Sequence, residues 1–397
     1  MPNKHQPGDL KQMQSLPLEA KIRMTQQRIQ ARYDSWTRFE IVNEATGKTR
    51  YETIDTRDYM AEPKLKESEY IASAIPGQVY VSFSGGKDST VLKHIVDQMY
   101  DDVPSLFANT GLEYPEIQMF VKDVKAGKWD CFNPNVEIIR PEMRFDEVIK
   151  KYGYPAISKE VSETIYYAKH AKSDSYKSTR IQRLNGELKD KNGNKSAFNC
   201  DKWKFMLDAP FEVHNACCAV MKKKPAKKYA KQSGRKPIVG TLAEESRLRM
   251  QQWIRGGCNS FEGAKARSAP MSFWTEQDIL HYIKQYNVPY CSVYGDIQVK
   301  KTDEVEPGQI NMIDFLGCYE PEDTLETTGC DRTGCIFCMF GCHLEKEPNR
   351  FQRLKETHPR QYEYCIGGGE MVDGKWQPSK EGLGLGKVLD YIGVKYE

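Results

Sequence analysis

Apolar positions in the middle of the chain follow two alternating periods. Short apolar runs typical of strands are separated by stretches with an apolar residue every three or four positions. The runs are QVYVSF, PSLFAN, VEIIRP and KPIVGTL, and the stretches between them include DSTVLKHIVDQMY and EIQMFVKDVKAG. Strands that alternate with amphipathic helices are typical of a parallel sheet with helices on both faces. The pattern therefore predicts an α/β fold.

The same pattern divides the chain into three parts. Residues 1–70 hold one amphipathic helical stretch and a hairpin pattern around Gly47, and we interpret them as an accessory segment. Residues 71–295 hold the strand–helix alternation, interrupted by a polar insert at 173–196 that we expect on the surface. Residues 296–397 are rich in cysteine and glycine and are predicted to form a small C-terminal module.

Composition narrows the class of protein. Of the 397 residues, 39% are hydrophobic and 28% are charged, which excludes wholesale disorder. No apolar run approaches the roughly 18 residues of a membrane span. The first residues are too polar for a signal peptide, so we expect a cytoplasmic protein without a membrane partner.

Charge is local rather than global. The net charge is only +3, yet residues 221–236 carry lysine and arginine and no acid. This run is either a solvated helix face or a surface that meets phosphates, and the second reading leaves open a nucleic-acid substrate.

The most distinctive stretch joins the first strand to the first helix of the alternation. There, YVSF runs into two glycines, a lysine, an aspartate and a serine. Free backbone N–H groups at a helix N-terminus suit an anion, most often a phosphate. Asp88 would cap the helix or help to hold the Mg²⁺ that accompanies phosphates. Neither a Walker loop nor a dinucleotide fingerprint has this spacing, and the alternative is a tight turn with a capped helix.

The twelve cysteines are many for a reducing compartment, where disulfides do not persist. Cys217 and Cys218 are adjacent, and four more, Cys330, Cys335, Cys338 and Cys342, follow one another closely. Clustered cysteines in a cytoplasmic protein favour metal binding over packing.

Five motifs give the chain a resemblance to a known family. Residues 84–89, SGGKDS, match the SGGxDS signature of the PP-loop ATP pyrophosphatase superfamily. The segments at Asn109–Glu116, Cys217–Pro225, Gly240–Arg249 and Pro270–Tyr294 resemble, in order, those of phosphoadenylyl-sulfate (PAPS) reductases of the iron–sulfur type. The resemblance covers roughly half of the chain. It implies an adenine nucleotide alpha-hydrolase-like, Rossmann-like sheet that binds ATP, PAPS or adenylyl sulfate (APS) at its carboxyl edge.

The resemblance also implies site residues. Lys87, Asp88 and Arg249 would be catalytic. The nucleotide would be bound by Ser84, Gly85, Gly86, Lys87, Asp88, Ser89, Asn109, Thr110, Gly111, Lys222, Gly240 and Ser246. A protein that donates sulfur or electrons would be a partner.

Cysteine ligands follow from the same resemblance. Cys217-Cys218 and Cys335-x-x-Cys338 resemble the ligands of a [4Fe–4S] cluster in adenylyl-sulfate reductases. Cys330 would replace Cys217 if the downstream block instead resembles that of DNA phosphorothioation proteins of the same superfamily. A structural zinc held by Cys330, Cys335, Cys338 and Cys342 is the alternative. We expect Cys131, Cys200, Cys291 and Cys318 to be packing residues, and we assign no role to Cys258.

The sequence departs from the strict reductases in three places. The ECGLH-like motif with the nucleophilic cysteine is absent, and the last cysteine, Cys365, has the neighbours of an ordinary thiol. Leu242 stands where the family has an arginine, and Asn109 replaces an aspartate.

Three functions remain open after these departures. The first is a reductase of PAPS or APS. The second is an enzyme that adenylylates a substrate with ATP and then transfers sulfur, which the loop and the missing nucleophile favour. The third is a nucleotide- or nucleic-acid-binding regulator without turnover.

Overall fold

The computed structural model describes residues 4–56, 61–260, 267–300 and 323–397. The chain folds into two compact units, each assembled from separate segments. Unit 1 comprises residues 1–107, 114–139 and 227–333, and unit 2 comprises 108–113, 140–226 and 334–397. These units cross the sequence boundaries predicted at residues 70 and 295. Among the described residues, no helix is long and apolar enough to cross a membrane.

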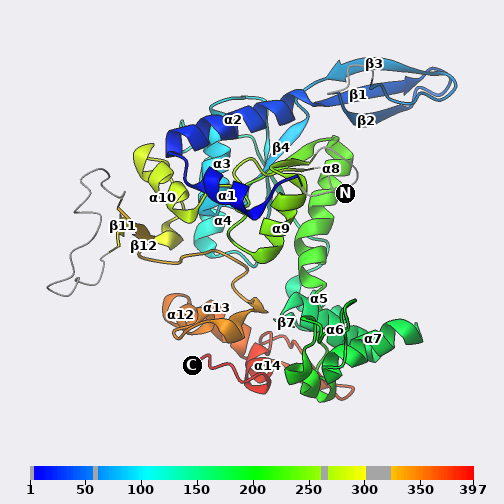
Figure 1. The fold of residues 1–397 in the computed structure, drawn as a ribbon, viewed down its shortest axis with the longest axis vertical. Helices are drawn as coiled ribbons and strands as arrows, with labels where there is room; N and C mark the ends of the chain where they lie inside the picture. The colour runs from blue at the N-terminus through cyan, green and yellow to red at the C-terminus, as the bar shows by residue number, and fades with distance from the viewer. Residues whose placement is uncertain (1–3, 57–60, 261–266, 301–322) are drawn as a thin grey trace. The chain divides into compact units, whose positions relative to one another are not determined.

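Unit 1 is built on a six-stranded sheet with the order β6-β5-β4-β8-β10-β9 (Figure 1). The pairs β4–β5, β4–β8 and β8–β10 are parallel, whereas β9 runs antiparallel to β10. The strands are β4 (Val79–Ser82), β5 (Ser105–Ala108), β6 (Val136–Ile139), β8 (Lys236–Val239), β9 (Asn259–Ser260) and β10 (Arg267–Ser268). The predicted α/β fold with a parallel central sheet is therefore confirmed.

Most helices of unit 1, although not α8, bury apolar residues in a common core with this sheet. In α3, Val91, Leu92, Ile95 and Val96 are at most 1% exposed and lie in the same core cluster as Val79 and Val81 of β4. The helices are α1 (Pro7–Gln14), α2 (Leu18–Asp34), α3 (Lys87–Asp97), α4 (Pro115–Lys125), α8 (Lys224–Ser233), α9 (Arg247–Gly256) and α10 (Glu276–Gln285). The short elements η4 (Ser292–Tyr294), β11 (Ile297–Val299) and β12 (Leu325–Thr327) complete the unit.

The N-terminal segment belongs to this core in part. Ile22 and Ile29 of α2 are buried in the main cluster, and the Trp274 indole N–H donates to Thr25 Oγ1 over 2.9 Å. The predicted hairpin around Gly47 is present as β1 (Trp36–Asn43) and β2 (Thr49–Asp55), and β3 (Glu69–Ile75) joins it as an antiparallel third strand. In Figure 1 this small sheet projects beyond the end of α2. Only the small sheet fits the expectation of an accessory segment.

Unit 2 is mainly helical. Its sheet contacts are short, and β7 pairs in parallel with β13. Its elements are α5 (Phe145–Tyr152), β7 (Ala156–Ile157), α6 (Lys159–His170), α7 (Asp174–Asn185), η1 (Asp201–Asp208), η2 (Ala219–Lys223), β13 (Met339–Phe340), η5 (Cys342–Leu344), α12 (Arg350–Thr357), α13 (Pro359–Ile366), β14 (Glu370–Val372), β15 (Lys375–Gln377) and α14 (Leu385–Tyr391). The polar insert at 173–196 forms α7 and a following turn, and most of its side chains are exposed, as predicted.

Candidate functional site

The loop after β4 adopts the conformation that its glycines permit. Gly85 has φ +73°, a left-handed value that favours glycine. A Cβ at this position would lie 2.9 Å from Ile117 Cγ2 of α4. Gly86 is the N-cap of α3, so the backbone N–H groups of the first turn have no acceptor within the helix and point out of its end. The turn is thus fixed by packing against α4, and α3 begins at Gly86 without a capping side chain, so the cap predicted for Asp88 is not observed.

Serine hydroxyls hold the loop closed on itself. The backbone N–H of Ser84 donates to Ser89 Oγ over 3.1 Å, and the two serine hydroxyls are 3.0 Å apart. Ser89 Oγ also donates to the Gly86 carbonyl over 2.9 Å. The loop is therefore held by hydrogen bonds of its own serine side chains.

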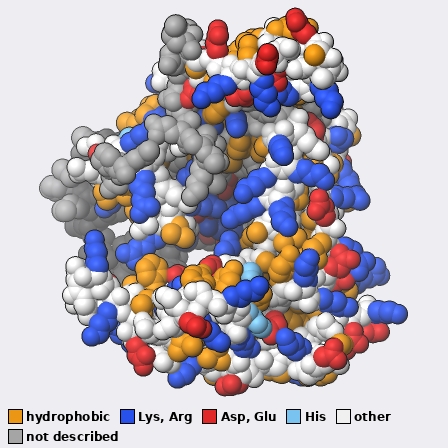
Figure 2. Space-filling view, turned by 90° about the vertical axis from the view of Figure 1, so that its right-hand side faces the viewer, with side chains coloured by type: hydrophobic (Ala, Val, Ile, Leu, Met, Phe, Trp, Pro, Cys, Tyr) orange, Lys and Arg blue, Asp and Glu red, His pale blue; other side chains and the backbone are white. Residues whose placement is uncertain are grey.

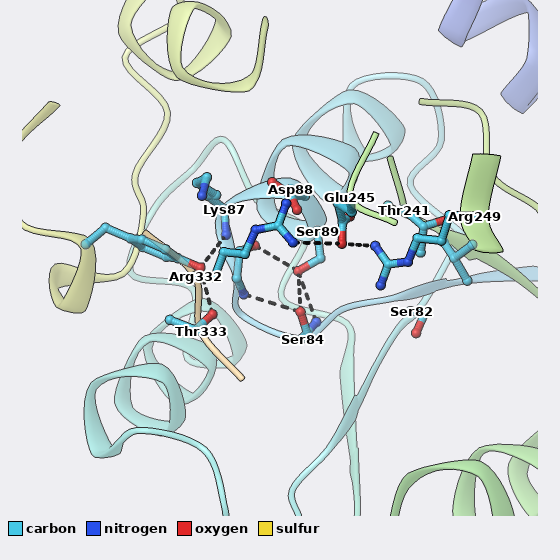
Figure 3. Close-up of a pocket in the computed structure, with 14 residues that line it drawn as sticks. Ser82, Ser84, Lys87, Asp88, Ser89, Thr241, Glu245, Arg249, Arg332 and Thr333 are labelled. Carbon is cyan, nitrogen blue, oxygen red and sulfur yellow. Dashed lines mark hydrogen bonds and ion pairs between the residues drawn. The ribbon is translucent and has the colours of Figure 1, made fainter. Parts of the chain in front are cut away.

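A cavity of about 290 Å³ opens above this loop (Figure 3). It is lined by Ser82, Ser84, Gly86, Lys87, Asp88, Ser89, Val239, Gly240, Thr241, Glu245, Arg249, Tyr294, Arg332 and Thr333. The lining comes from the carboxyl ends of the parallel neighbours β4 and β8, from the start of α3, and from α9 and the segment after β12. This is the edge at which open α/β sheets bind ligands.

Gly240 allows two of these elements to approach closely. A Cβ at Gly240 would lie 3.0 Å from the Asp88 carbonyl oxygen and 3.2 Å from Ser89 Cα. A side chain here would push the end of β8 away from the first turn of α3. The sequence predicted Gly240 as a nucleotide-binding residue, and the structure adds this packing reason for a glycine.

Lys87 is already engaged inside the cavity wall. Its side chain is 6% exposed, and Nζ lies 2.7 Å from Glu276 Oε1. The ammonium also donates to the Asp331 carbonyl, and the backbone N–H of Lys87 donates to the Tyr294 hydroxyl over 3.1 Å. An incoming phosphate would therefore compete with a carboxylate for this cation.

The charged groups around Asp88 suit a negatively charged phosphate together with a metal cation. Burial raises the pKa of the Asp88 carboxyl, while the cations Lys87, Arg332 and Arg249 act in the opposite direction. Burial and the charge of Arg332 lower the pKa of Arg249. A phosphate would be attracted by the arginines, and Mg²⁺, which is held by one or two carboxylates together with phosphates, would suit Asp88.

The structure brings half of the predicted nucleotide ligands into one cavity. Six of the twelve line it, namely Ser84, Gly86, Lys87, Asp88, Ser89 and Gly240, and so does Arg249, which was predicted to be catalytic. Gly85 shapes the loop from behind, and the Ser246 side chain caps α9 by accepting from the Arg249 N–H. Leu242, at the position of the family arginine, is 2% exposed and lies in the core. Asn109, Thr110, Gly111 and Lys222 belong to unit 2 and are not among the lining residues.

Several residues in or beside the cavity wall were missed by the sequence reasoning, among them Glu245, Glu276, Tyr294, Arg332 and Thr333. Tyr294 ended a quoted motif, and the spacing of Glu245 and Arg249 is that of a helical i,i+4 ion pair, so both carried a usable signal. Arg332 and Thr333 had none, because they lie between cysteines and reach the cavity only through the tertiary fold.

In unit 2 the motif thiols form a second group of polar residues. The Cys217 thiol donates to Cys218, which lowers the pKa of Cys218 and raises that of Cys217; Lys159 and Lys222 lower the pKa of Cys218 further. Cys335 and Cys338 are near enough to raise the pKa of Cys217 as well. Burial is the main cause of the raised pKa of Cys335, which is about 11, and of Cys338.

The segment at 109–113 is attached to this thiol group. Glu113 accepts from the Thr110 backbone over 3.0 Å and from Thr110 Oγ1 over 2.7 Å. Its Oε1 lies 3.7 Å from Lys222 Nζ, and the Ile336 N–H donates to the Leu112 carbonyl over 2.8 Å. Lys222 and the Asn109–Gly111 motif therefore lie beside the cysteines of unit 2.

The remaining cysteines divide as follows. Cys330 belongs to unit 1, where its N–H donates to the Val293 carbonyl over 3.0 Å. Cys200, Cys258 and Cys291 are buried, whereas Cys131 is partly exposed, and Cys318 lies outside the described residues. Cys365 is 0% exposed, and burial raises its pKa well above the ordinary value. Among the described residues, no three His, Cys, Asp or Glu side chains form a group that would hold a metal ion.

A family model agrees with the motifs, and two further proteins are similar to parts of the chain. A solved PAPS reductase from Candida auris, in a phosphate complex, is similar with a TM-score of 0.31 and 17% identity, over 54% of this chain and 75% of that one. An uncharacterized protein of Methanocaldococcus jannaschii is 36% identical over 77 residues, which are 19% of this chain and only 18% of that protein's length. The model of the phosphoadenosine phosphosulfate reductase domain matches residues 78–170 and 157–339, more than half of the chain. The chain therefore belongs to the phosphoadenosine phosphosulfate reductase domain family.

Proposed function

We propose that this protein binds ATP at the loop of residues 84–89 and uses it to adenylylate a substrate oxygen, which sulfur then replaces. The observation that carries the proposal is the cavity above the start of α3, where a glycine-opened helix N-terminus lies beside Lys87, Arg249 and Arg332. A chain of phosphates places several negative charges together, and this cavity supplies several cations and backbone donors together.

The chemistry needs stabilisation of charge at the phosphates. A substrate oxygen attacks the α-phosphorus of ATP, the bond from that phosphorus to the bridging oxygen breaks, and pyrophosphate leaves with the electron pair. Lys87 and the α3 N-terminus would stabilise the growing negative charge, and Asp88 would hold the accompanying Mg²⁺. In the second step a sulfur nucleophile displaces AMP from the activated carbon, so that oxygen leaves with the phosphate.

We further propose that the thiols of unit 2 hold a [4Fe–4S] cluster. The donor set fits in kind, because four thiols are what such a cluster needs and Cys217, Cys218, Cys335 and Cys338 lie in one unit, although they do not form a closed metal-binding group in the described residues. Cys335 and Cys338 raise the pKa of Cys217, which favours Cys217 as the fourth ligand. When bound, the cluster would supply sulfur or electrons, and a donor protein would be needed to restore it.

The first test is made on anaerobically purified protein. We expect stoichiometric iron and sulfide, reduced in Cys218→Ser and Cys338→Ser. Stoichiometric zinc in a colourless preparation would contradict the cluster and favour the structural-zinc alternative.

The second test separates sulfur transfer from reduction. The alternative function is a strict PAPS or APS reductase, which needs a reactive cysteine that attacks sulfur. Cys365 is fully buried and burial raises its pKa, which argues against that role for Cys365. We expect pyrophosphate release from ATP that survives Cys365→Ser and is lost in Asp88→Ala. Sulfite release from PAPS, lost in Cys365→Ser, would establish the reductase.

A nucleic-acid partner is a further candidate, favoured by one face of α8. Lys224, Lys227, Lys228 and Lys231 are exposed and recur at i, i+3, i+4 and i+7, so they share one face of the helix. Figure 2 shows Lys and Arg side chains gathered on the side of the molecule where α8 lies in Figure 1. Such a face would contact a phosphate backbone without reading its sequence.

This candidate is tested by its salt dependence. Replacing Lys224, Lys227 and Lys231 with Gln should weaken binding of a labelled duplex and lower the slope of log affinity against log salt by about three. Lys189→Gln with Lys191→Gln, on the exposed turn of unit 2, is the matched control. Equal slopes in the wild type and the α8 variant would contradict a nucleic-acid role for this face.

A further inference from the structure

The segment Asp331–Thr333, which we call the strap, forms one wall of the cavity in unit 1. The Lys87 ammonium donates to the Asp331 carbonyl across 244 positions of sequence. The Thr333 hydroxyl lies 2.7 Å from the Tyr294 hydroxyl, which also accepts from the Lys87 N–H. The strap therefore lies against the phosphate end of the proposed nucleotide site rather than against the sheet.

Between these two anchors, Arg332 extends its side chain toward Glu245 (Figure 3). The Arg332 side chain is 57% exposed, and Nη1 lies 3.8 Å from Glu245 Oε2. The same carboxylate oxygen pairs with Arg249, while Glu245 Oε1 accepts from the Leu242 N–H over 3.1 Å. One fixed carboxylate thus holds two guanidinium groups that come from distant parts of the sequence.

Arg332 and Arg249 lie close enough for their like charges to repel each other. Arg332 contributes to the lowered pKa of Arg249, and both cations oppose the raised pKa of Asp88. At 3.8 Å the pair Arg332–Glu245 is longer than a charge-assisted hydrogen bond of about 2.7–2.9 Å. Arg332 is therefore only loosely held by Glu245, and an anion in the cavity would offer it a closer partner.

We propose that Arg332 is a further anion-binding residue of this cavity and that it contacts the outer phosphates of a bound nucleotide. Glu245 is the carboxylate that both Arg332 and Arg249 approach. This inference rests on the proposed function and extends it: the site selects a nucleotide with a chain of phosphates over a nucleoside monophosphate. Guanidinium groups suit this task, because their planar donors bind phosphate oxygens in pairs.

The test is calorimetric titration of the full chain with ATP, AMP and inorganic pyrophosphate. We expect Arg332→Ala to weaken ATP and pyrophosphate binding about tenfold to a hundredfold, the usual effect of one lost hydrogen bond to a charged group. AMP affinity should change less than about threefold. Arg332→Lys, which keeps the charge but not the paired donors, should fall between the wild type and Arg332→Ala.

Arg247→Ala is the matched control, since Arg247 is exposed on the same helix as Arg249 and is not a lining residue. It removes the same charge and should leave all three affinities unchanged.

Unchanged ATP affinity in Arg332→Ala, or an equal loss for ATP and AMP, would overturn the role of Arg332 alone. Wild-type protein that binds pyrophosphate through Arg332 but no nucleotide would support this role and overturn the proposed function. Binding of none of the three ligands would overturn both.

Discussion

At the scale of single residues, the loop glycines Gly85 and Gly86 have different roles, which substitutions can distinguish. An alanine at Gly86 would place its Cβ 3.1 Å from Thr333 Oγ1 and 3.2 Å from the Tyr294 hydroxyl, on the cavity side. An alanine at Gly85 would place it against Ile117 in the core, at a positive φ. The first change should therefore affect binding and the second should affect folding.

We expect Gly86→Ala to lower ATP affinity about tenfold with less than about 1 kcal/mol lost from the free energy of unfolding. Gly85→Ala should cost about 1–3 kcal/mol of that free energy, because the backbone is strained and the core is overpacked. Urea unfolding and calorimetric titration of both variants measure the two effects. Equal stability losses in the two variants would contradict this division.

A buried histidine on α3 makes stability depend on pH. His94 is 3% exposed, its Nδ1 lies 2.9 Å from the Tyr282 hydroxyl, and burial lowers its pKa. The unfolded chain therefore binds a proton at this ring more readily than the folded protein does. Stability should consequently be present above the ordinary histidine pKa of about 6.5 and be lost as the pH falls below it, by at most about 1.4 kcal/mol per pH unit.

The measurement is the urea midpoint between pH 7.5 and pH 5.5. His94→Gln should show a shallower decrease than the wild type, since glutamine keeps a hydrogen-bonding group but does not titrate in this range. His281→Gln, at a partly exposed position of α10, is the control. A decrease that is identical in His94→Gln and the wild type would rule out His94 as its source.

At the scale of elements, α2 is joined to α10 by a buried ion pair. Lys21 Nζ lies 2.7 Å from Asp278 Oδ1, and the two side chains are 3% and 12% exposed. Asp278 also accepts from the backbone and hydroxyl of Thr275, which caps α10. Removing one partner of a buried pair leaves an uncompensated charge, so Lys21→Met should cost about 3–5 kcal/mol of unfolding free energy.

This prediction also tests the place of the N-terminal segment in the fold. The double variant Lys21→Met with Asp278→Asn should recover part of the loss, because no buried charge then remains unpaired. Chemical denaturation of the single and double variants measures the coupling. A change below about 0.5 kcal/mol in Lys21→Met would show that α2 is peripheral to the core.

At the scale of the whole molecule, both units are assembled from non-contiguous segments. A chain cut at residue 295, the boundary suggested by the sequence, would lose residues 334–397 of unit 2 and the strap of unit 1. It would lose the Tyr154 hydroxyl bond to the Leu383 carbonyl, 2.9 Å long, and the pairing of β7 with β13. We expect the 1–295 fragment to lack a cooperative unfolding transition and to be cut rapidly by protease within 140–226.

The control for this truncation is the full-length Tyr154→Phe variant, which removes only the hydroxyl bond. It should unfold cooperatively with a loss of about 1–2 kcal/mol. A 1–295 fragment that unfolds cooperatively and resists protease would show that residues 71–295 form an independent domain.

Local patterns were sufficient for the elements and for the loop. Apolar periods of two and about 3.6 reflect which side chains face the core, so β4, α3, β5 and α4 were predictable from the sequence. The turn at Gly85 and the helix start at Gly86 were predictable for the same local reason. The surface that α2 packs against was not predictable from residues 1–70, because an amphipathic face does not identify its packing partner.

The sequence by itself determined the family motifs, the α/β alternation and the glycine-containing turn before α3, since these depend on neighbouring residues. Only the tertiary structure decided that Lys87 is paired with Glu276, that Glu245 holds Arg249 and Arg332 together, and that Cys330 lies in a different unit from Cys335. It also decided that Lys222 lies beside the thiols, although its motif suggested a nucleotide ligand. These pairings join positions far apart in the chain, and which distant groups meet is set by how the elements pack, which no local pattern encodes.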